Sequence, residues 1–138
     1  MGASGYTGSE VLRILLNHPL VKIKALIGKR SAGKSISEIF TNFDGIELPT
    51  INALEKSDFS NIDVLFSCVP SGVLSKNIDK LPKNIIIIDL SSDFRFQDID
   101  IYNAYYNTHS SPSYVKSFIY GLTEIFRDKI KNKKFISC

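Results

Sequence analysis

Hydrophobic residues recur along the chain at two different spacings, which predict two kinds of secondary structure. Within residues 7–17 they fall on one face of a helix, and Pro19 stands just beyond the end of that stretch. Residues 21–27 alternate between apolar and polar side chains and are rich in β-branched ones, a pattern typical of a strand. The chain is therefore predicted to open with a helix that leads into a strand.

The same alternation continues toward the C-terminus. Further strands are predicted at residues 63–68, 85–89 and 134–137. Further helices are predicted at residues 71–81 and 124–130, with two shorter candidates at 35–40 and 54–59. Strands that are almost continuously apolar and alternate with helices indicate a parallel sheet covered on both faces. The expected fold class is α/β, with a doubly wound parallel sheet of the Rossmann type.

The size and hydrophobicity of the chain limit the number of domains. Its 138 residues are 43% hydrophobic, enough for one ordinary core, so we expect a single domain over residues 1–138. The longest apolar run, residues 85–88, is far shorter than the roughly 20 residues of a membrane span. No signal peptide is visible either, so we expect no membrane partner.

Charge and cysteine content exclude further classes. The net charge is +3, and the densest basic stretch, residues 127–134, is interrupted by Asp128 and Ile130. That pattern favours a solvated helix end over a nucleic-acid surface. The two cysteines, Cys68 and Cys138, lie far apart and have no spacing suited to zinc. We therefore expect a cytoplasmic protein that needs neither metal nor nucleic acid.

Residues 2–8 read Gly-Ala-Ser-Gly-Tyr-Thr-Gly, a glycine-rich turn of the kind that holds the pyrophosphate of a dinucleotide. Gly2 would allow a tight turn, Gly5 would let the backbone approach a phosphate, and Gly8 would let the helix pack against the sheet. On this motif alone, a plain turn before a core helix stays open as the alternative. The cofactor-binding residues predicted here are Gly2, Ser4, Gly5, Tyr6, Thr7 and Gly8.

The position of this turn affects the expected sheet. Such a turn normally follows a buried strand, yet only Met1 precedes it. We therefore expect the doubly wound sheet to lack its first strand, which would be a central one.

A second cofactor segment lies about 20 residues beyond the turn, where NAD-specific folds place an acidic residue for the ribose 2′-hydroxyl. This chain has Lys29, Arg30 and Ser31 there instead. Two cations and a hydroxyl suit a 2′-phosphate, so we predict NADP as the cofactor. The alternative is that these residues only decorate an exposed loop.

The carboxyl ends of parallel strands face the ligand in such folds, which makes two loops candidates. In the first, Val69, Pro70 and Ser71 could line the nicotinamide ribose. The second, residues 89–95, brings together two carboxylates, two hydroxyls and an arginine, although turn chemistry explains these residues equally well. Cys68 fits a small buried hydrophobe better than a nucleophile, and His109 has no catalytic role without a partner.

Five segments occur in an order seen in one protein family: residues 2–8 (GASGYTG), 16–19 (LNHP), 31–34 (SAGK), 89–95 (DLSSDFR) and 120–124 (YGLTE). Through them the chain resembles N-acetyl-gamma-glutamyl-phosphate reductases over residues 2–138. The resemblance implies NADPH-dependent reduction of a small-molecule acyl phosphate, N-acetyl-glutamyl 5-phosphate, to its semialdehyde in arginine biosynthesis. It also implies a homo-oligomer at full length.

The family's nucleophile is the cysteine of a Pro-Gly-Cys segment, which forms a thioester, and a histidine of a second domain acts as acid and base. No Pro-Gly precedes Cys138, which aligns just before that segment. We therefore expect the nucleophile just beyond Cys138, no second domain, no catalytic residue within the chain, and no activity of the fragment alone. A competing alignment makes Cys138 the nucleophile. A related aspartate-semialdehyde dehydrogenase and a non-catalytic nucleotide-binding module stay open as alternatives.

Overall fold

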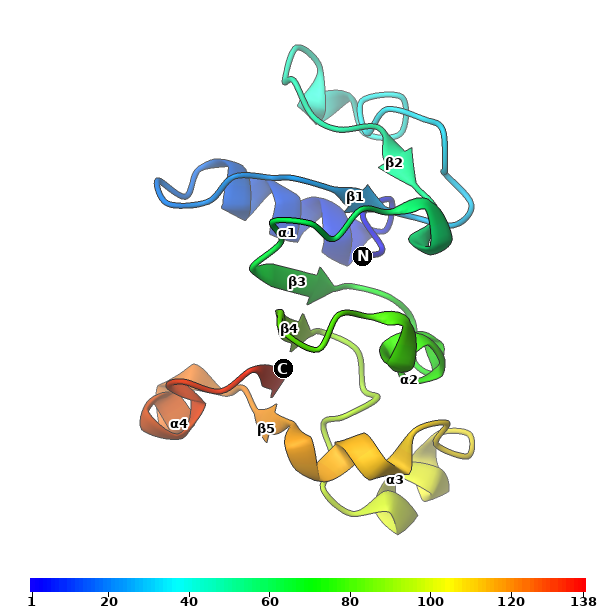
Figure 1. The fold of residues 1–138 in the computed structure, drawn as a ribbon, viewed down its shortest axis with the longest axis vertical. Coiled ribbons are helices and arrows are strands. Elements are labelled where there is room, and N and C mark those ends of the chain that lie inside the picture. The colour runs from blue at the N-terminus through cyan, green and yellow to red at the C-terminus, as the bar shows by residue number, and fades with distance from the viewer. The chain divides into compact units, whose positions relative to one another are not determined.

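The computed structural model describes residues 1–138 and divides them into two compact units, Met1–Ile62 and Asp63–Cys138. Helices and strands alternate along both units (Figure 1). Every pair of neighbouring strands is parallel, which confirms the predicted α/β class with parallel sheets. The strands form two sheets, one of two strands in the first unit and one of four in the second.

The first unit holds one long helix and a short strand pair. Its elements are α1 (Tyr6–Leu16), β1 (Leu26–Ile27), the 3₁₀ turn Thr41–Phe43, β2 (Ile51–Asn52) and the 3₁₀ turn Leu54–Lys56. Leu26 pairs with Ile51 across the sheet, and both belong to one hydrophobic core. The other buried members of that core are Ala3, Leu12, Ile36 and Phe43.

Two predictions for the first unit are wrong in extent. The strand predicted at 21–27 is reduced to Leu26–Ile27, because only these two residues pair with another strand. The short helix predicted at 35–40 is a single turn closed by N–H groups of Ile39 and Phe40 on the carbonyl oxygen of Ile36. The Glu38 carboxylate accepts the N–H and the hydroxyl of Ser35, as in the capping box at the start of a helix. The capping contacts are thus present, but no helix continues beyond this turn.

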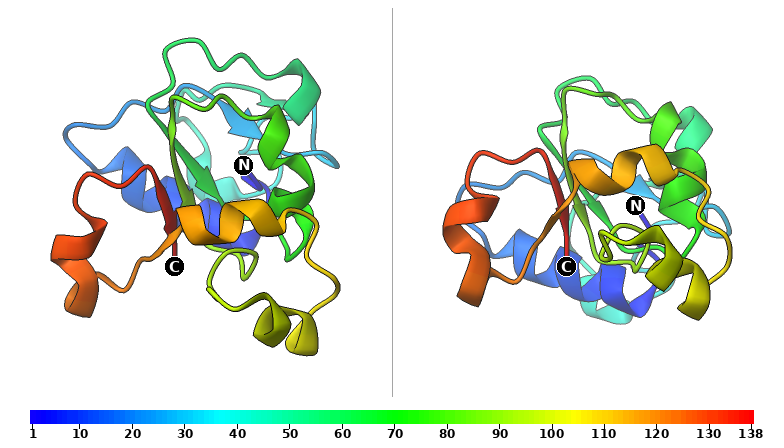
Figure 2. Two further views of the ribbon diagram at one scale, coloured as in Figure 1. Left: turned by 60° about the horizontal axis from the view of Figure 1, so that its bottom comes forward. Right: turned by 90° about the horizontal axis from the view of Figure 1, so that it is seen from below.

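The second unit contains the larger sheet. Its elements are β3 (Val64–Ser67), α2 (Val73–Asn77) continued by the 3₁₀ turn Ile78–Lys80, β4 (Ile86–Asp89), α3 (Ile99–Tyr105), the 3₁₀ helix Pro112–Ser117, β5 (Ile119–Tyr120), α4 (Thr123–Ile130) and β6 (Phe135–Ser137). The strand order is β3-β4-β6-β5. Figure 2 shows α4 on one side of this sheet and α2 on the other, as a doubly wound fold requires.

The segment between β4 and α4 holds three elements that the hydrophobic pattern did not predict. α3 begins where the Asp98 carboxylate accepts the N–H groups of Asp100 and Ile101. Behind it, the rings of Phe94 and Phe118 stack with centroids 4.1 Å apart, and Phe118 also stacks on Phe135 of β6. This part of the chain is therefore stabilised by packed aromatic rings, whereas the other elements are stabilised by regularly spaced aliphatic residues. None of the helices is long and apolar enough to cross a membrane.

Candidate functional site

The glycine-rich segment forms a tight turn directly before α1. Gly2 has a φ of +81°, a conformation that favours glycine, and its carbonyl oxygen accepts the N–H of Gly5 at 3.1 Å. The N–H groups of Gly2 and Ala3 both donate to the carbonyl oxygen of Ile27, at 2.8 and 3.1 Å. The turn is thus tied to the end of β1.

Gly8 is required by the closeness of the helix to this turn. A Cβ atom on Gly8 would lie 2.2 Å from the Gly2 oxygen and 3.0 Å from the Ala3 Cα. The contact is made with the backbone of the turn, and not with the sheet as predicted from the sequence. Either contact requires glycine at this position.

The first turn of α1 presents unused hydrogen-bond donors. The N-cap is Gly5, which supplies no side-chain cap, and no acidic residue occupies the first turn. The N–H groups of Tyr6, Thr7 and Gly8 have no backbone or side-chain acceptor. Three unpaired donors at the positive end of a helix form a site suited to an anion such as a phosphate.

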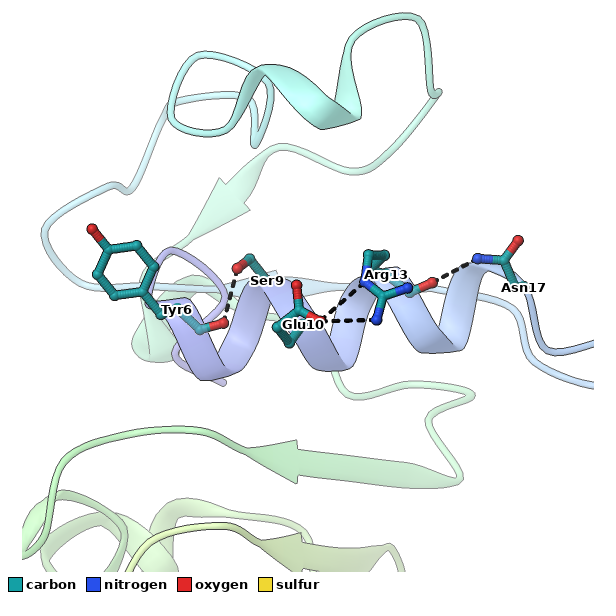
Figure 3. A network of polar contacts seen from close by, with 5 residues as sticks. All are labelled: Tyr6, Ser9, Glu10, Arg13 and Asn17. Atoms are coloured by element: carbon teal, nitrogen blue, oxygen red, sulfur yellow. Dashed lines mark hydrogen bonds and ion pairs between the residues drawn. The ribbon is translucent and has the colours of Figure 1, made fainter.

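Side-chain contacts along α1 leave these donors unused (Figure 3). The Ser9 hydroxyl donates to the carbonyl oxygen of Tyr6 at 2.8 Å, and Arg13 forms an ion pair with Glu10 at 2.9 Å. Asn17 then closes the other end by donating its side-chain N–H to the Arg13 carbonyl oxygen. The Tyr6 ring itself is 87% exposed.

The predicted 2′-phosphate segment lies against the same turn. A Cβ atom on Gly28 would lie 3.3 Å from the Ser4 hydroxyl oxygen and 3.0 Å from Ile51, so Gly28 is what lets the two segments approach. Lys29 and Arg30 follow at once, are exposed, and form no ion pair. The structure thus brings Ser4 close to this segment, and both cations there remain available to a ligand. Gly28 was not among the predicted site residues, although a glycine at the end of a strand is a signal of close approach.

The second unit places Val69, Pro70 and Ser71 directly after β3, at the carboxyl end of its sheet. Pro70 and Ser71 are exposed and Val69 is half-buried. The Ser71 hydroxyl lies 2.5 Å from that of Ser92 in the loop after β4, and the Ser67 carbonyl oxygen accepts the Leu90 N–H. The two loops singled out in the sequence are therefore hydrogen-bonded to each other.

His109 has a structural role in this region. Its Nδ1 atom accepts the N–H of Ser111 at 3.1 Å, so the proton lies on Nε2, which donates to the carbonyl oxygen of Asp93 at 2.6 Å. The ring is buried, with Phe94 and Tyr102 packed edge-on against it. Both ring nitrogens are thus occupied by backbone groups and neither is available for proton transfer.

The ends of β4 and β6 bring a carboxylate, a thiol and a guanidinium together. Asp89 is fully buried, and burial raises its pKa to about 6 against the opposing effect of its hydrogen bonds from Ser91. Its carbonyl oxygen accepts the Cys138 N–H at 2.8 Å, while the Arg95 guanidinium donates to the Cys138 carbonyl oxygen at 2.8 Å.

Neither cysteine is an activated thiol. Burial, reinforced by the charge of Asp89, raises the pKa of Cys138, although Arg95 opposes the shift. Burial also raises the pKa of Cys68. The Cys138 sulfur would lie 2.8 Å from a Cβ atom on Gly121, so that glycine makes room for it beside β6. No group of three histidine, cysteine or acidic side chains is placed to hold a metal ion.

A parallel α/β fold with a glycine turn leading into a helix whose first N–H groups are unpaired defines a dinucleotide-binding domain. Residues 1–133 match the family described as semialdehyde dehydrogenase, NAD binding domain. The chain belongs to this family, and the cofactor of the domain is a nicotinamide dinucleotide.

Named relatives resemble the chain over its whole length. It is 40% identical over 138 residues to the "Probable N-acetyl-gamma-glutamyl-phosphate reductase, chloroplastic" of Oryza sativa subsp. japonica, covering 99% of this chain and 33% of that protein. It is also 40% identical over 139 residues to the N-acetyl-gamma-glutamyl-phosphate reductase of Ehrlichia chaffeensis, covering 100% of this chain and 40% of that protein. The chain thus spans between 33% and 40% of the length of these relatives, and the resemblance noted in the sequence is confirmed.

A solved structure has the same fold. Aspartate semialdehyde dehydrogenase with NADP from Candida albicans matches with a TM-score of 0.61 at 19% identity, over 100% of this chain and 40% of that one. At this identity the match concerns the fold alone.

Proposed function

We propose that this chain is the NADP-binding part of an N-acetyl-gamma-glutamyl-phosphate reductase. The observation that carries the proposal is 40% identity to proteins of that name along the entire chain, the glycine turn included. The reaction would reduce N-acetyl-glutamyl 5-phosphate to N-acetyl-glutamate 5-semialdehyde, with hydride supplied by NADPH. Homo-oligomeric assembly and a cytoplasmic location remain predictions.

Within the first unit, the pyrophosphate would accept hydrogen bonds from the unpaired N–H groups of Tyr6, Thr7 and Gly8. The glycines leave room for its oxygens, and the Ser4 and Thr7 hydroxyls are further donors. Lys29, Arg30 and Ser31 would hold the 2′-phosphate, since they follow Gly28, which lies against Ser4. In the second unit, Val69, Pro70 and Ser71 would contact the nicotinamide ribose, as residues at the carboxyl ends of strands do in this fold.

The raised pKa of Cys138 supports a different cysteine as the nucleophile. A thiol attacks an acyl phosphate as its thiolate, which partial desolvation and the nearby Asp89 carboxylate disfavour at Cys138. No Pro-Gly-Cys segment occurs within the 138 residues. We therefore propose that the nucleophile belongs to that family segment and that these 138 residues alone are inactive.

A hybrid enzyme tests this function directly. The 139 matched residues of the Ehrlichia chaffeensis reductase are replaced by this chain, so that the relative supplies everything outside the match. The hybrid should reduce N-acetyl-glutamyl 5-phosphate with NADPH, or run the reverse reaction from semialdehyde and phosphate with NADP⁺. The unmodified relative is the control. A folded hybrid that is inactive, or one that prefers aspartyl phosphate, would contradict the proposal.

The choice of NADP over NAD predicts the effect of Arg30→Ala. Loss of an exposed charge-assisted contact to the 2′-phosphate should weaken NADPH binding by about tenfold and leave NADH binding unchanged. Lys24→Ala removes an equally exposed cation outside the predicted segment and should change neither affinity. Fluorescence titration with both cofactors measures the effect. Equal binding of NADH and NADPH by the unchanged protein would refute the 2′-phosphate role.

A further inference from the structure

Asp93 is a fully buried carboxylate that reaches from the loop after β4 to the start of α2. One of its oxygens accepts the N–H of Gly72 at 2.5 Å, and the other accepts the N–H of Ser75 at 2.8 Å. Gly72 is the N-cap of α2 and supplies no side-chain cap of its own. Asp93 therefore does for α2 what an N-cap side chain normally does, from a position 18 and 21 residues away.

The neighbours of Asp93 tie the same two loops together. The Ser92 hydroxyl pairs with that of Ser71, and the Leu90 N–H donates to the Ser67 carbonyl oxygen. Consecutive contacts thus run from residues 90–93 to the segment that begins at the end of β3. That segment contains Val69, Pro70 and Ser71.

A second layer of contacts holds Asp93 in place. The Tyr102 hydroxyl donates to its carboxylate at 3.3 Å, and Nε2 of His109 donates to its carbonyl oxygen. The Ser111 hydroxyl donates to the carbonyl oxygen of Ser75 at 2.7 Å, which fixes the first turn of α2 from the other side. Each of these donors comes from α3 or from the residues after it, so the carboxylate is locked within a packed cluster.

We propose that Asp93 is a positioning residue for the nicotinamide end of the cofactor site, acting through the segment 69–72 that its carboxylate and Ser92 anchor. The proposal rests on the proposed function, which assigns Val69, Pro70 and Ser71 to the nicotinamide ribose. Without the carboxylate, the N–H groups of Gly72 and Ser75 lose their acceptors, and residues 69–72 become less ordered. Part of the binding free energy of the cofactor is then spent on ordering this segment, which lowers the affinity.

The test compares NADPH with adenosine 2′,5′-bisphosphate, which carries the 2′-phosphate but no nicotinamide ribose. Asp93→Asn keeps the size of the side chain and replaces one accepting oxygen with a donor. It should weaken NADPH binding by about tenfold and leave binding of the bisphosphate unchanged. Ser92→Ala removes only the contact to Ser71 and should give a smaller loss with the same selectivity.

Asp98→Asn is the matched control, because Asp98 caps α3 in the same unit with a carboxylate that accepts two N–H groups. It should lower the stability of the protein without selecting between the two ligands. If Asp93→Asn does not fold, the selectivity of Ser92→Ala decides. Equal weakening of both ligands, or of neither, overturns the positioning role. Failure of the unchanged protein to bind either ligand overturns the proposed function instead.

Discussion

Replacing Gly8 with alanine should destabilise the first unit by about 3 kcal/mol and abolish dinucleotide binding. The added Cβ would lie 2.2 Å from the Gly2 carbonyl oxygen, and no rotamer can relieve a clash between two backbone-fixed atoms. Helix propensity alone predicts the opposite, since alanine within α1 would gain about 1 kcal/mol over glycine. A loss of stability in Gly8→Ala would therefore show that the steric clash with the turn outweighs helix propensity, and a gain would show the reverse.

Urea unfolding followed by circular dichroism measures the stability, and titration with NADPH measures binding. Gly5→Ala is the matched control, because its Cβ would lie at an ordinary 3.5 Å from the same oxygen and its φ of −92° suits alanine. We expect Gly5→Ala to fold almost as well as the unchanged protein and to bind NADPH more weakly, since the predicted phosphate must approach the Gly5 backbone closely. A Gly8→Ala protein as stable as Gly5→Ala would show that the turn can move away from the helix.

Features that depend on nearby residues could be predicted from the sequence. α1 begins and ends within one residue of the predicted limits, because its apolar face, its glycine N-cap and the following proline are all local signals. The glycine turn could be predicted equally well, since the need for glycine at positions 2 and 8 arises from contacts among residues 2–8 themselves.

Features that depend on distant partners could not be predicted. Residues 21–25 have the alternation of a strand, but no neighbouring strand forms hydrogen bonds to them. Their strand propensity alone therefore does not make them part of a sheet. The elements between residues 96 and 122 are stabilised by stacked aromatic rings whose partners lie on other strands and loops. The hydrophobic periodicity within one segment does not indicate such contacts with distant residues.

The same distinction applies to the candidate site. Asp89, Asp93 and Arg95 were grouped correctly as one loop. Asp93, however, accepts from Gly72 and Ser75, 21 and 18 residues away, and Arg95 donates to Cys138, 43 residues away. The raised pKa of Asp89 comes from its burial in the folded sheet. His109 was ambiguous for this reason, because only the folded structure supplies the Ser111 N–H and the Asp93 carbonyl oxygen that fix its tautomer. Sequence spacing identified the loop, and tertiary contacts assigned the roles.

Asp89 predicts an unusual dependence of stability on pH. Its carboxylate accepts the N–H and the hydroxyl of Ser91, yet burial and the nearby Asp93 raise its pKa to about 6 from the ordinary 3.8. The folded protein therefore binds this proton more tightly than the unfolded chain. The resulting stabilisation is complete below pH 3.8 and is lost as the pH rises through about 6. A shift of two units corresponds to about 3 kcal/mol.

Asp89→Asn should remove this dependence, because asparagine resembles the protonated acid at every pH. Its amide could also donate to the hydroxyl of Ser137, which pairs with residue 89 across the sheet and has no hydrogen-bond partner of its own. Relative to the unchanged protein, the variant should gain about 3 kcal/mol between pH 4 and pH 7. Urea unfolding of both proteins across that range measures the difference.

Asp58→Asn provides a control of opposite sign. A hydrogen bond from the Ser60 N–H lowers the pKa of the exposed Asp58, so its small stabilisation is present at neutral pH and is lost as the pH falls. The two variants should therefore deviate from the unchanged protein in opposite directions as the pH rises. A difference between Asp89→Asn and the unchanged protein that stays constant from pH 4 to pH 7 would mean that Asp89 ionises in the folded sheet as readily as it does in water.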